Sequence, residues 1–146
     1  MISGEILQAG TRVGFMLEDV TNATVGVLAH VNIRQGPKIG KYGVNLADIS
    51  RVGVTAIVSA LSDADVVVID EIGPMELCSP AFIDAVRKAL CSPKPLVGTI
   101  HRSASHPMIE FIKGNPHYEI LEVTAQNRDQ VPFVVEEKLK EADKLV

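Results

Sequence analysis

Short apolar runs alternate with polar or glycine-rich stretches along the chain, and the first third of this pattern predicts a hairpin followed by a loop. Residues 12–17 and 25–31 are rich in apolar side chains. The polar residues 21–24 between them have the composition of a turn, which predicts a β-hairpin. Residues 34–43 hold three glycines and a proline. They predict an irregular exposed loop, a kind of segment that often carries ligand contacts.

The rest of the chain reads as helices and strands in alternation. Residues 46–61 carry apolar side chains at nearly helical spacing, and Gly53 is expected to break this helix into two pieces. The β-branched run within 65–69 predicts a central strand that is buried on both faces of a parallel sheet. Ser79 followed by Pro80 predicts the start of a helix. The remaining predicted elements are strands at 96–100 and 118–123 and helices at 107–113 and 130–145.

This alternation predicts an α/β fold: a three-layer, mainly parallel sheet with helices on both faces. A length of 146 residues is near the common size of one domain, so we expect a single domain over 1–146. The composition is 47% hydrophobic but only 4% aromatic, which fits an aliphatic core.

Charge and cysteine usage exclude several classes of function. The formal net charge of -4 gives no general attraction to nucleic acid or to an anionic membrane, so we expect neither as a partner. Cys78 and Cys91 form neither a Cys-x-x-Cys pair nor a Cys/His cluster, which argues against zinc. The sequence has no leader-like start and no apolar run of membrane-spanning length, so we expect a cytoplasmic protein.

The first candidate site follows the run at 66–69. Ligands of such sheets bind beyond the carboxyl ends of the strands, where Asp70 and Glu71 lie. Four apolar residues followed by Asp-Glu is the Walker B arrangement of nucleoside triphosphatases. Asp70 is therefore the candidate metal residue, for Mg²⁺ bound together with the β- and γ-phosphates of a nucleotide, and Glu71 is the candidate catalytic residue that polarises the attacking water. A purely structural strand end is the alternative.

The sequence Val-Ile-Asp-Glu-Ile-Gly-Pro-Met-Glu-Leu at 68–77 closely resembles the signature of the thermophilic nucleoside-triphosphatase family, also called cancer-related nucleoside triphosphatase. Further resemblances follow in family order at 10–15, 40–44, 79–82, 96–101, 106–107 and 124–129. The resemblance covers nearly the whole chain. It implies a P-loop fold of the ASCE type that hydrolyses ATP, GTP and other nucleoside triphosphates with magnesium.

One family feature has no counterpart in the sequence. Family members open with a strand, a Gly-x-x-x-x-Gly-Lys-Ser/Thr loop (Walker A) and a helix, and no such loop occurs in the 146 residues. We therefore expect a truncated domain that lacks the first strand, the P-loop and the first helix. Residues 36–42 do not replace the loop, because the spacer is one residue short, Pro37 lacks a backbone donor and Tyr42 stands at the Ser/Thr position.

Several other residues are weaker candidates for nucleotide contacts. Lys41, with Arg34, could bind phosphate, although solvated loop cations are an equal alternative. Thr99 ends the strand expected beside Asp70 and could sense the γ-phosphate, whereas a structural hydroxyl is the simpler alternative. His101, two residues after Thr99, is a further candidate for this role, and a structural histidine is the alternative. The last candidates are Asn127 and Arg128, which could contact the base or a phosphate or could instead form a helix cap and a surface ion pair. Glu76 is expected to bond to local backbone.

Three hypotheses about function remain open at this stage. The polypeptide is a complete nucleoside triphosphatase whose start is misplaced or shortened in this sequence, or it is a loop-less module that binds nucleotide for regulation. The third hypothesis is a structural protein that self-associates as a homo-oligomer through an exposed sheet edge. Without the loop, we expect the chain as given to be inactive or very weakly active.

Overall fold

The computed structural model describes residues 1–143. They fall into two compact units, one over Met1–His106 and one that begins at Pro107. The expectation of one domain over 1–146 stays a prediction. None of the helices in the described part of the chain is both long enough and apolar enough to cross a membrane.

The first unit contains a seven-stranded sheet with the order β4-β5-β3-β2-β1-β6-β7. Its strands are β1 (Ile2–Gln8), β2 (Thr11–Asp19), β3 (Thr24–His30), β4 (Lys38–Ile39), β5 (Tyr42–Val44), β6 (Val67–Ile72) and β7 (Leu96–Ile100). The two pairings of β6, with β1 on one side and β7 on the other, are parallel. The other four pairings are antiparallel. The sheet is therefore mixed, and the prediction of a mainly parallel sheet is wrong.

Tight turns explain why the amino-terminal strands are antiparallel. Ala9 and Gly10 join β1 to β2, and both have positive φ angles, 47° and 76°. A two-residue turn with two positive φ angles fits the right-handed twist of a hairpin and cannot connect parallel strands. The predicted hairpin is confirmed as β2 and β3, and β1 extends it to a three-stranded meander that the sequence analysis did not predict.

The expected loop at 34–43 contains more order than its composition indicates. Two very short strands, β4 and β5, pair around Gly40 and Lys41 at the far edge of the sheet from β7. Gly40 has a φ of 58°, a conformation that glycine adopts without strain. The segment is thus a small edge hairpin that follows an irregular stretch.

The helical segment after β5 is continuous. It consists of α1 (Leu46–Asp48), the π-helix η1 (Ile49–Val54) and α2 (Thr55–Asp63). Gly53 is buried inside the π-helical stretch and does not break the helix, so that prediction is wrong. A Cβ atom at Gly53 would lie 3.3 Å from the sulfur of Met1 and 3.7 Å from the ring of Phe82. A glycine here lets the helix pack closely on its neighbours.

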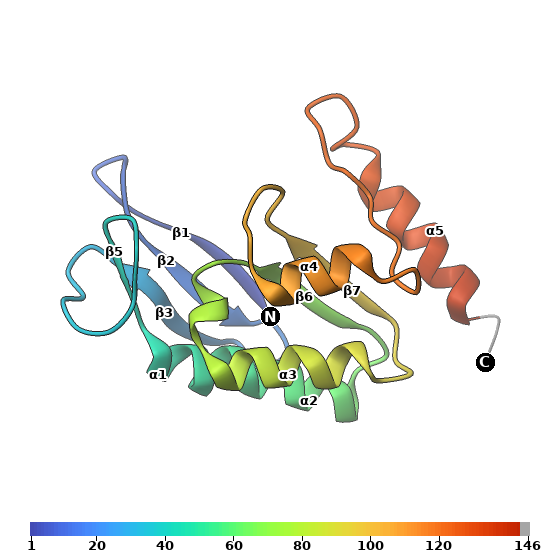
Figure 1. Cartoon of the computed structure of the whole chain (residues 1–146), viewed down its shortest axis with the longest axis horizontal. Coiled ribbons are helices and arrows are strands. Elements are labelled where there is room, and N and C mark those ends of the chain that lie inside the picture. The colour runs from blue at the N-terminus through green and yellow to red at the C-terminus, as the bar shows by residue number, and fades with distance from the viewer. Residues whose placement is uncertain (144–146) are drawn as a thin grey trace. The chain divides into compact units, whose positions relative to one another are not determined.

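The helices of the first unit lie along one face of the sheet (Figure 1). The π-helix η1 contacts β2, β3 and α3 (Pro80–Leu90), and α2 contacts α3 and β6. Within this unit the helices cover one face of the sheet, and the predicted helical layer on the other face stays a prediction. The exposure of β6 agrees with cover on one face, because Val67 and Ile69 are fully buried whereas Val68 is 43% exposed. The prediction that this strand is buried on both faces is therefore wrong.

The helix predicted after Ser79 is confirmed. The Ser79 hydroxyl accepts a hydrogen bond from the Phe82 backbone N–H at 3.2 Å, and Pro80 occupies the first helical position. Phe82 and Val86 are completely buried and attach this helix to the core. A short 3₁₀ turn, η2 (Glu76–Cys78), connects β6 to α3.

Lys94 closes the carboxyl end of α2. Its ammonium group donates hydrogen bonds to the backbone carbonyls of Ala60, Ser62 and Ala64 at 3.3, 3.1 and 2.6 Å. These carbonyls belong to the helix end that carries partial negative charge. We expect Lys94→Met to lower the free energy of unfolding by about 1–3 kcal/mol, because three charge-assisted bonds are lost. Thermal unfolding beside the exposed-site control Lys88→Met measures this, and equal melting temperatures of the two variants would contradict it.

The second unit contains two helices, α4 (Pro107–Gly114) and α5 (Val131–Asp143). The predicted helix at 107–113 is confirmed. The predicted helix at 130–145 is confirmed up to residue 143, and the remaining predicted positions lie outside the described residues. The predicted strand at 118–123 is wrong, because this segment pairs with none of the described strands and leaves Ile120, Leu121 and Val123 exposed. Without a neighbouring strand, β propensity alone does not form a sheet.

Candidate functional site

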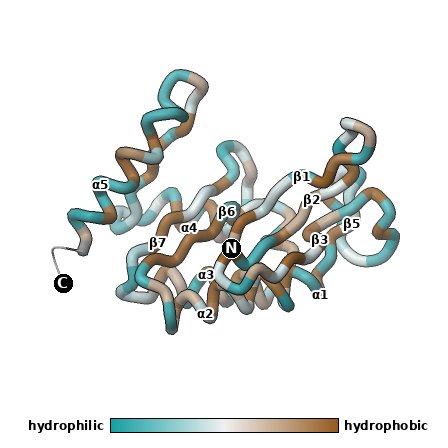
Figure 2. The backbone as a smooth tube through the Cα atoms, turned by 180° about the vertical axis from the view of Figure 1, so that it is seen from behind, coloured by the Kyte–Doolittle hydropathy of each residue, from teal (hydrophilic) through white to brown (hydrophobic). Residues whose placement is uncertain are grey.

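The candidate site lies where the two parallel strands β6 and β7 end. Figure 2 shows this pair mainly in the brown of hydrophobic residues. The pairing of Ile69 with Gly98 places the following residues, Asp70 and Thr99, beside each other. The Thr99 hydroxyl donates a hydrogen bond to Asp70 Oδ1 at 2.5 Å, and both side chains are exposed. Two of the residues singled out in the sequence therefore meet at one point.

Glu71 follows Asp70 through a cis peptide bond and is half-buried. Burial raises the pKa of Glu71 above its ordinary value, the nearby His101 ring opposes this rise, and the Asp70 carboxylate adds to it. A carboxylate whose pKa is moved toward neutrality is better suited to accept a proton from water. The position and the environment of Glu71 therefore suit a general base.

His101 is fixed by its own loop. Its Nδ1 atom accepts hydrogen bonds from the backbone N–H groups of Ser103 and Ala104 at 3.3 and 3.0 Å. The neutral ring must then carry its proton on Nε2. His101 thus presents a donor from the end of β7, close enough to Glu71 to influence its pKa.

A second carboxyl group approaches Glu71, and the sequence analysis assigned it no role in the site. A Cβ atom at Gly73 would lie 2.5 Å from Oε1 of Glu71 and 2.9 Å from Oε2 of Glu76. The Glu76 side chain is only 1% exposed, and burial raises its pKa to about 7. The signal in the sequence was a Gly-Pro turn one residue after Asp-Glu, which reverses the chain beyond the end of β6.

The donors at this site fit magnesium. The Asp70 carboxylate and the Thr99 hydroxyl offer hard oxygen atoms at the open end of the strands. In the described part of the chain, no group of three or more His, Cys, Asp or Glu side chains could hold a metal ion. A single carboxylate suits Mg²⁺, which commonly takes one or two protein carboxylates and completes its shell with phosphate oxygens and water.

Lys41 is not brought to Asp70 within the sheet. It lies between β4 and β5, and β3, β2 and β1 separate that edge from β6. Its ammonium group lies 5.4 Å from the centre of the Tyr42 ring, a cation–π arrangement. The phosphate contact expected for Lys41 stays a prediction.

Asn127 and Arg128 belong to the second unit and are engaged locally. Asn127 Oδ1 accepts a hydrogen bond from the Thr124 N–H at 2.7 Å, and Nδ2 donates one to the Glu122 carbonyl at 2.8 Å. Arg128 lies 3.7 Å from the carboxylate of Asp129. The ion pair matches the alternative given for Arg128, whereas the Asn127 side chain bonds to backbone at residues 122 and 124 and is not the predicted helix cap.

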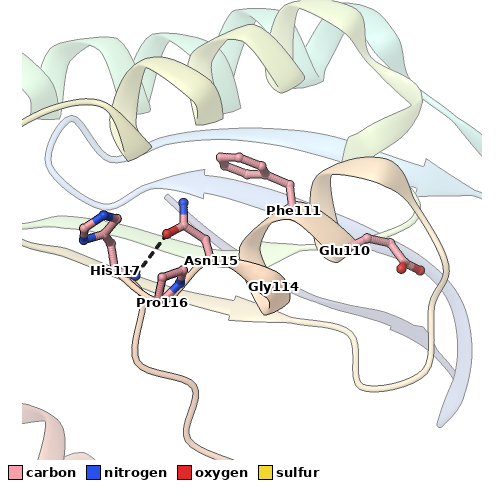
Figure 3. A pocket seen from close by; sticks show the side chains of 6 residues that line it. All are labelled: Glu110, Phe111, Gly114, Asn115, Pro116 and His117. Carbon is pink, nitrogen blue, oxygen red and sulfur yellow. Dashed lines mark hydrogen bonds between the residues drawn. The ribbon is translucent and has the colours of Figure 1, made fainter.

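The second unit also has a shallow hollow of about 470 Å³ at the end of α4. Figure 3 shows its lining residues, which are Glu110, Phe111, Gly114, Asn115, Pro116 and His117. The Asn115 side chain accepts a hydrogen bond from the His117 N–H at 3.0 Å. None of the residues singled out in the sequence lines this hollow.

Comparison with known proteins connects the site to a family. The family model described as NTPase matches residues 1–135. The chain belongs to the NTPase family. This match spans β6, β7 and the beginning of α5, so it includes Asp70, Glu71, Thr99, Asn127 and Arg128.

Individual members of the NTPase family agree with this assignment. The chain is 47% identical over 133 residues to nucleoside-triphosphatase THEP1 of Thermofilum pendens, a match that covers 90% of this chain and 73% of the relative. The THEP1 of Methanosarcina acetivorans is 45% identical over 131 residues, covering 89% and 72%. The crystal structure of THEP1 from Aquifex aeolicus superposes with a TM-score of 0.76 at 29% identity, over 89% of this chain and 77% of that one. The α/β fold and the family resemblance are thereby confirmed.

Proposed function

We propose that this chain carries a hydrolytic site for nucleoside triphosphates, in which Asp70 binds magnesium and Glu71 is the catalytic residue. The reaction is hydrolysis of ATP, GTP and other nucleoside triphosphates to the diphosphate and phosphate. The observation that supports this most strongly is the hydrogen bond between Thr99 and Asp70 at the ends of β6 and β7, with Glu71 as the next residue. Walker B chemistry requires an acidic pair at such a strand end.

Each side chain has a separate task in this proposal. A Mg²⁺ ion bound with the nucleotide would supply positive charge for its phosphates. Asp70 supplies the carboxylate that holds it, and the Thr99 hydroxyl fixes the direction of this carboxylate. Glu71, half-buried and with a raised pKa, orients the attacking water and accepts its proton. The His101 ring lies near enough to influence the pKa of this carboxylate.

The expected rate for the chain as given is very low. Much of phosphoryl-transfer catalysis is positioning, and the printed sequence has no Gly-x-x-x-x-Gly-Lys-Ser/Thr segment to hold the phosphates. A nucleotide-binding or regulatory module is the alternative that follows if binding occurs without turnover. The two possibilities share the same site and differ only in the fate of the bound nucleotide.

One observation favours self-association as a second candidate function. β7 is the last strand of the sheet order, and among the described strands it pairs only with β6. Its residues, Leu96–Ile100, include no charged side chain and no proline. Natural sheet edges usually carry such features, which block pairing with another chain. Light scattering tests this candidate, and a strictly monomeric protein at high concentration would count against it.

Calorimetric titration tests the proposed site directly. We expect saturable heat when Mg-ATP or Mg-GTP is added to the wild-type chain, and at least a tenfold weaker response with Asp70→Asn, which keeps the shape but loses the charge. The matched control is Asp63→Asn, a change at an exposed end of α2. Equal binding to wild type and Asp70→Asn would remove Asp70 from the site, and no heat at millimolar nucleotide would argue against both hydrolysis and binding.

A further inference from the structure

The turn after β6 brings two carboxyl groups to one point. The chain reverses at Gly73 and Pro74, and the backbone N–H of Leu77 donates a hydrogen bond to the Gly73 carbonyl at 3.0 Å. This reversal places Glu76 beside Glu71. Both carboxyl groups reach within 3 Å of the place where a side chain at Gly73 would begin. Because Gly73 has no side chain, the two groups can share this space.

The Glu76 carboxyl group is held without a cation. Its own backbone N–H and that of Gly73 donate hydrogen bonds to it, and Oε1 has no hydrogen-bond partner in the described structure. The ionisable groups that face it are Glu71 and Asp70 from β6 and the Cys78 thiol from η2. His101 faces Glu71 from the end of β7. A buried carboxyl group among negative neighbours is most stable when it carries a proton.

Packing alone does not account for this group. A leucine of similar size would fill the same space without the cost of burying a carboxyl group that lacks full hydrogen bonding. Gly73 in the turn and Glu76 on η2 both lie next to the Glu71 side chain. The space at Gly73 and the buried Glu76 carboxyl group therefore both restrict the direction of the Glu71 side chain.

We propose that Glu76 is a positioning residue for Glu71: its buried carboxyl group, with the space left by Gly73, fixes the direction of the Glu71 carboxylate. The positioning role rests on the function proposed for Glu71. The interaction between the two neighbouring carboxyl groups does not depend on that function and can be tested separately. The two carboxyl groups lie close enough for a charge on one to repel a charge on the other.

A double-mutant cycle in thermal unfolding tests the contact. At pH 8 we expect both Glu71→Gln and Glu76→Gln to raise the melting temperature, since each removes one of two neighbouring negative charges. The double variant should gain less than the two single shifts together, by about 2 °C or more, because the same repulsion is relieved only once. Additive shifts would overturn the proposal, because carboxyl groups that do not interact cannot position each other.

Steady-state hydrolysis tests the positioning role. We expect Glu76→Leu to lower kcat by about tenfold with KM unchanged, and Glu76→Gln, which keeps a neutral polar group, to restore kcat. We expect Gly73→Ala to lower kcat in the same way, because its Cβ displaces the Glu71 carboxylate, whereas Gly114→Ala, where the added atom meets open space, should not. An unchanged kcat in folded Glu76→Leu would overturn the positioning role. If the wild-type chain shows no hydrolysis, the proposed function fails while the cycle still decides whether the carboxyl groups interact.

Discussion

The stability of Glu76→Gln relative to wild type should be about 3 kcal/mol greater at pH 8 than at pH 4.5. The pKa of Glu76 is raised from 4.5 in a free side chain to about 7 by burial in the folded protein. The folded state therefore holds this proton more tightly than the unfolded state. The stability linked to Glu76 is fully present below its unfolded pKa and is lost as the pH rises through about 7. Glutamine has no proton to lose.

Urea unfolding of wild type and Glu76→Gln at pH 4.5, 6 and 8 measures this difference. The matched control is Glu18→Gln on β2, which lies outside the turn after β6. Other titrating groups are present in both proteins, so the difference reports on Glu76 together with its interaction with Glu71. Parallel stability curves for wild type and Glu76→Gln would contradict the assigned environment of Glu76.

Glu71→Gln should lower magnesium-dependent phosphate release by about 10²–10⁴-fold, the range expected when a general base is removed. Glutamine keeps the size of the side chain but cannot accept the proton of the attacking water. The folded structure should be unaffected, because Glu71 is half-buried and the change removes a negative charge next to Asp70. A quenched phosphate assay on equal amounts of folded protein, with Glu18→Gln as the control, measures the loss. Equal rates for wild type and Glu71→Gln would remove Glu71 from the catalytic role.

The sequence was most informative where local chemistry alone decides structure. The β-branched runs around Val67 and Val97 correctly predicted the β6 and β7 strands, and Ser79 with Pro80 correctly predicted the start of α3. Thr99 was expected on a central strand beside the strand of Asp70. The two strands are neighbours, but β7 is the last strand of the sheet and not a central one. The family followed from the motif around Asp70 because that motif combines a strand, an acidic pair and a turn in ten residues.

Features that depend on distant partners were not predictable in this way. Whether a strand is buried on one face or two depends on which helices reach it, and Val68 is exposed although its run is entirely apolar. The segment at 118–123 has strand-forming residues but pairs with none of the described strands. Glu76 lies only five positions after Glu71, yet its approach to Glu71 depends on the reversal at Gly73, which sequence spacing does not reveal.

Phosphate release from ATP by the purified wild-type chain, in Mg²⁺ and after addition of EDTA, tests the central claim most directly. The proposed site predicts slow release above the buffer blank in Mg²⁺, because Asp70 holds the ion with the nucleotide, and a return to the blank when EDTA removes it. Release that persists in EDTA would contradict a magnesium site at Asp70. Release equal to the blank under both conditions would contradict hydrolysis by this chain.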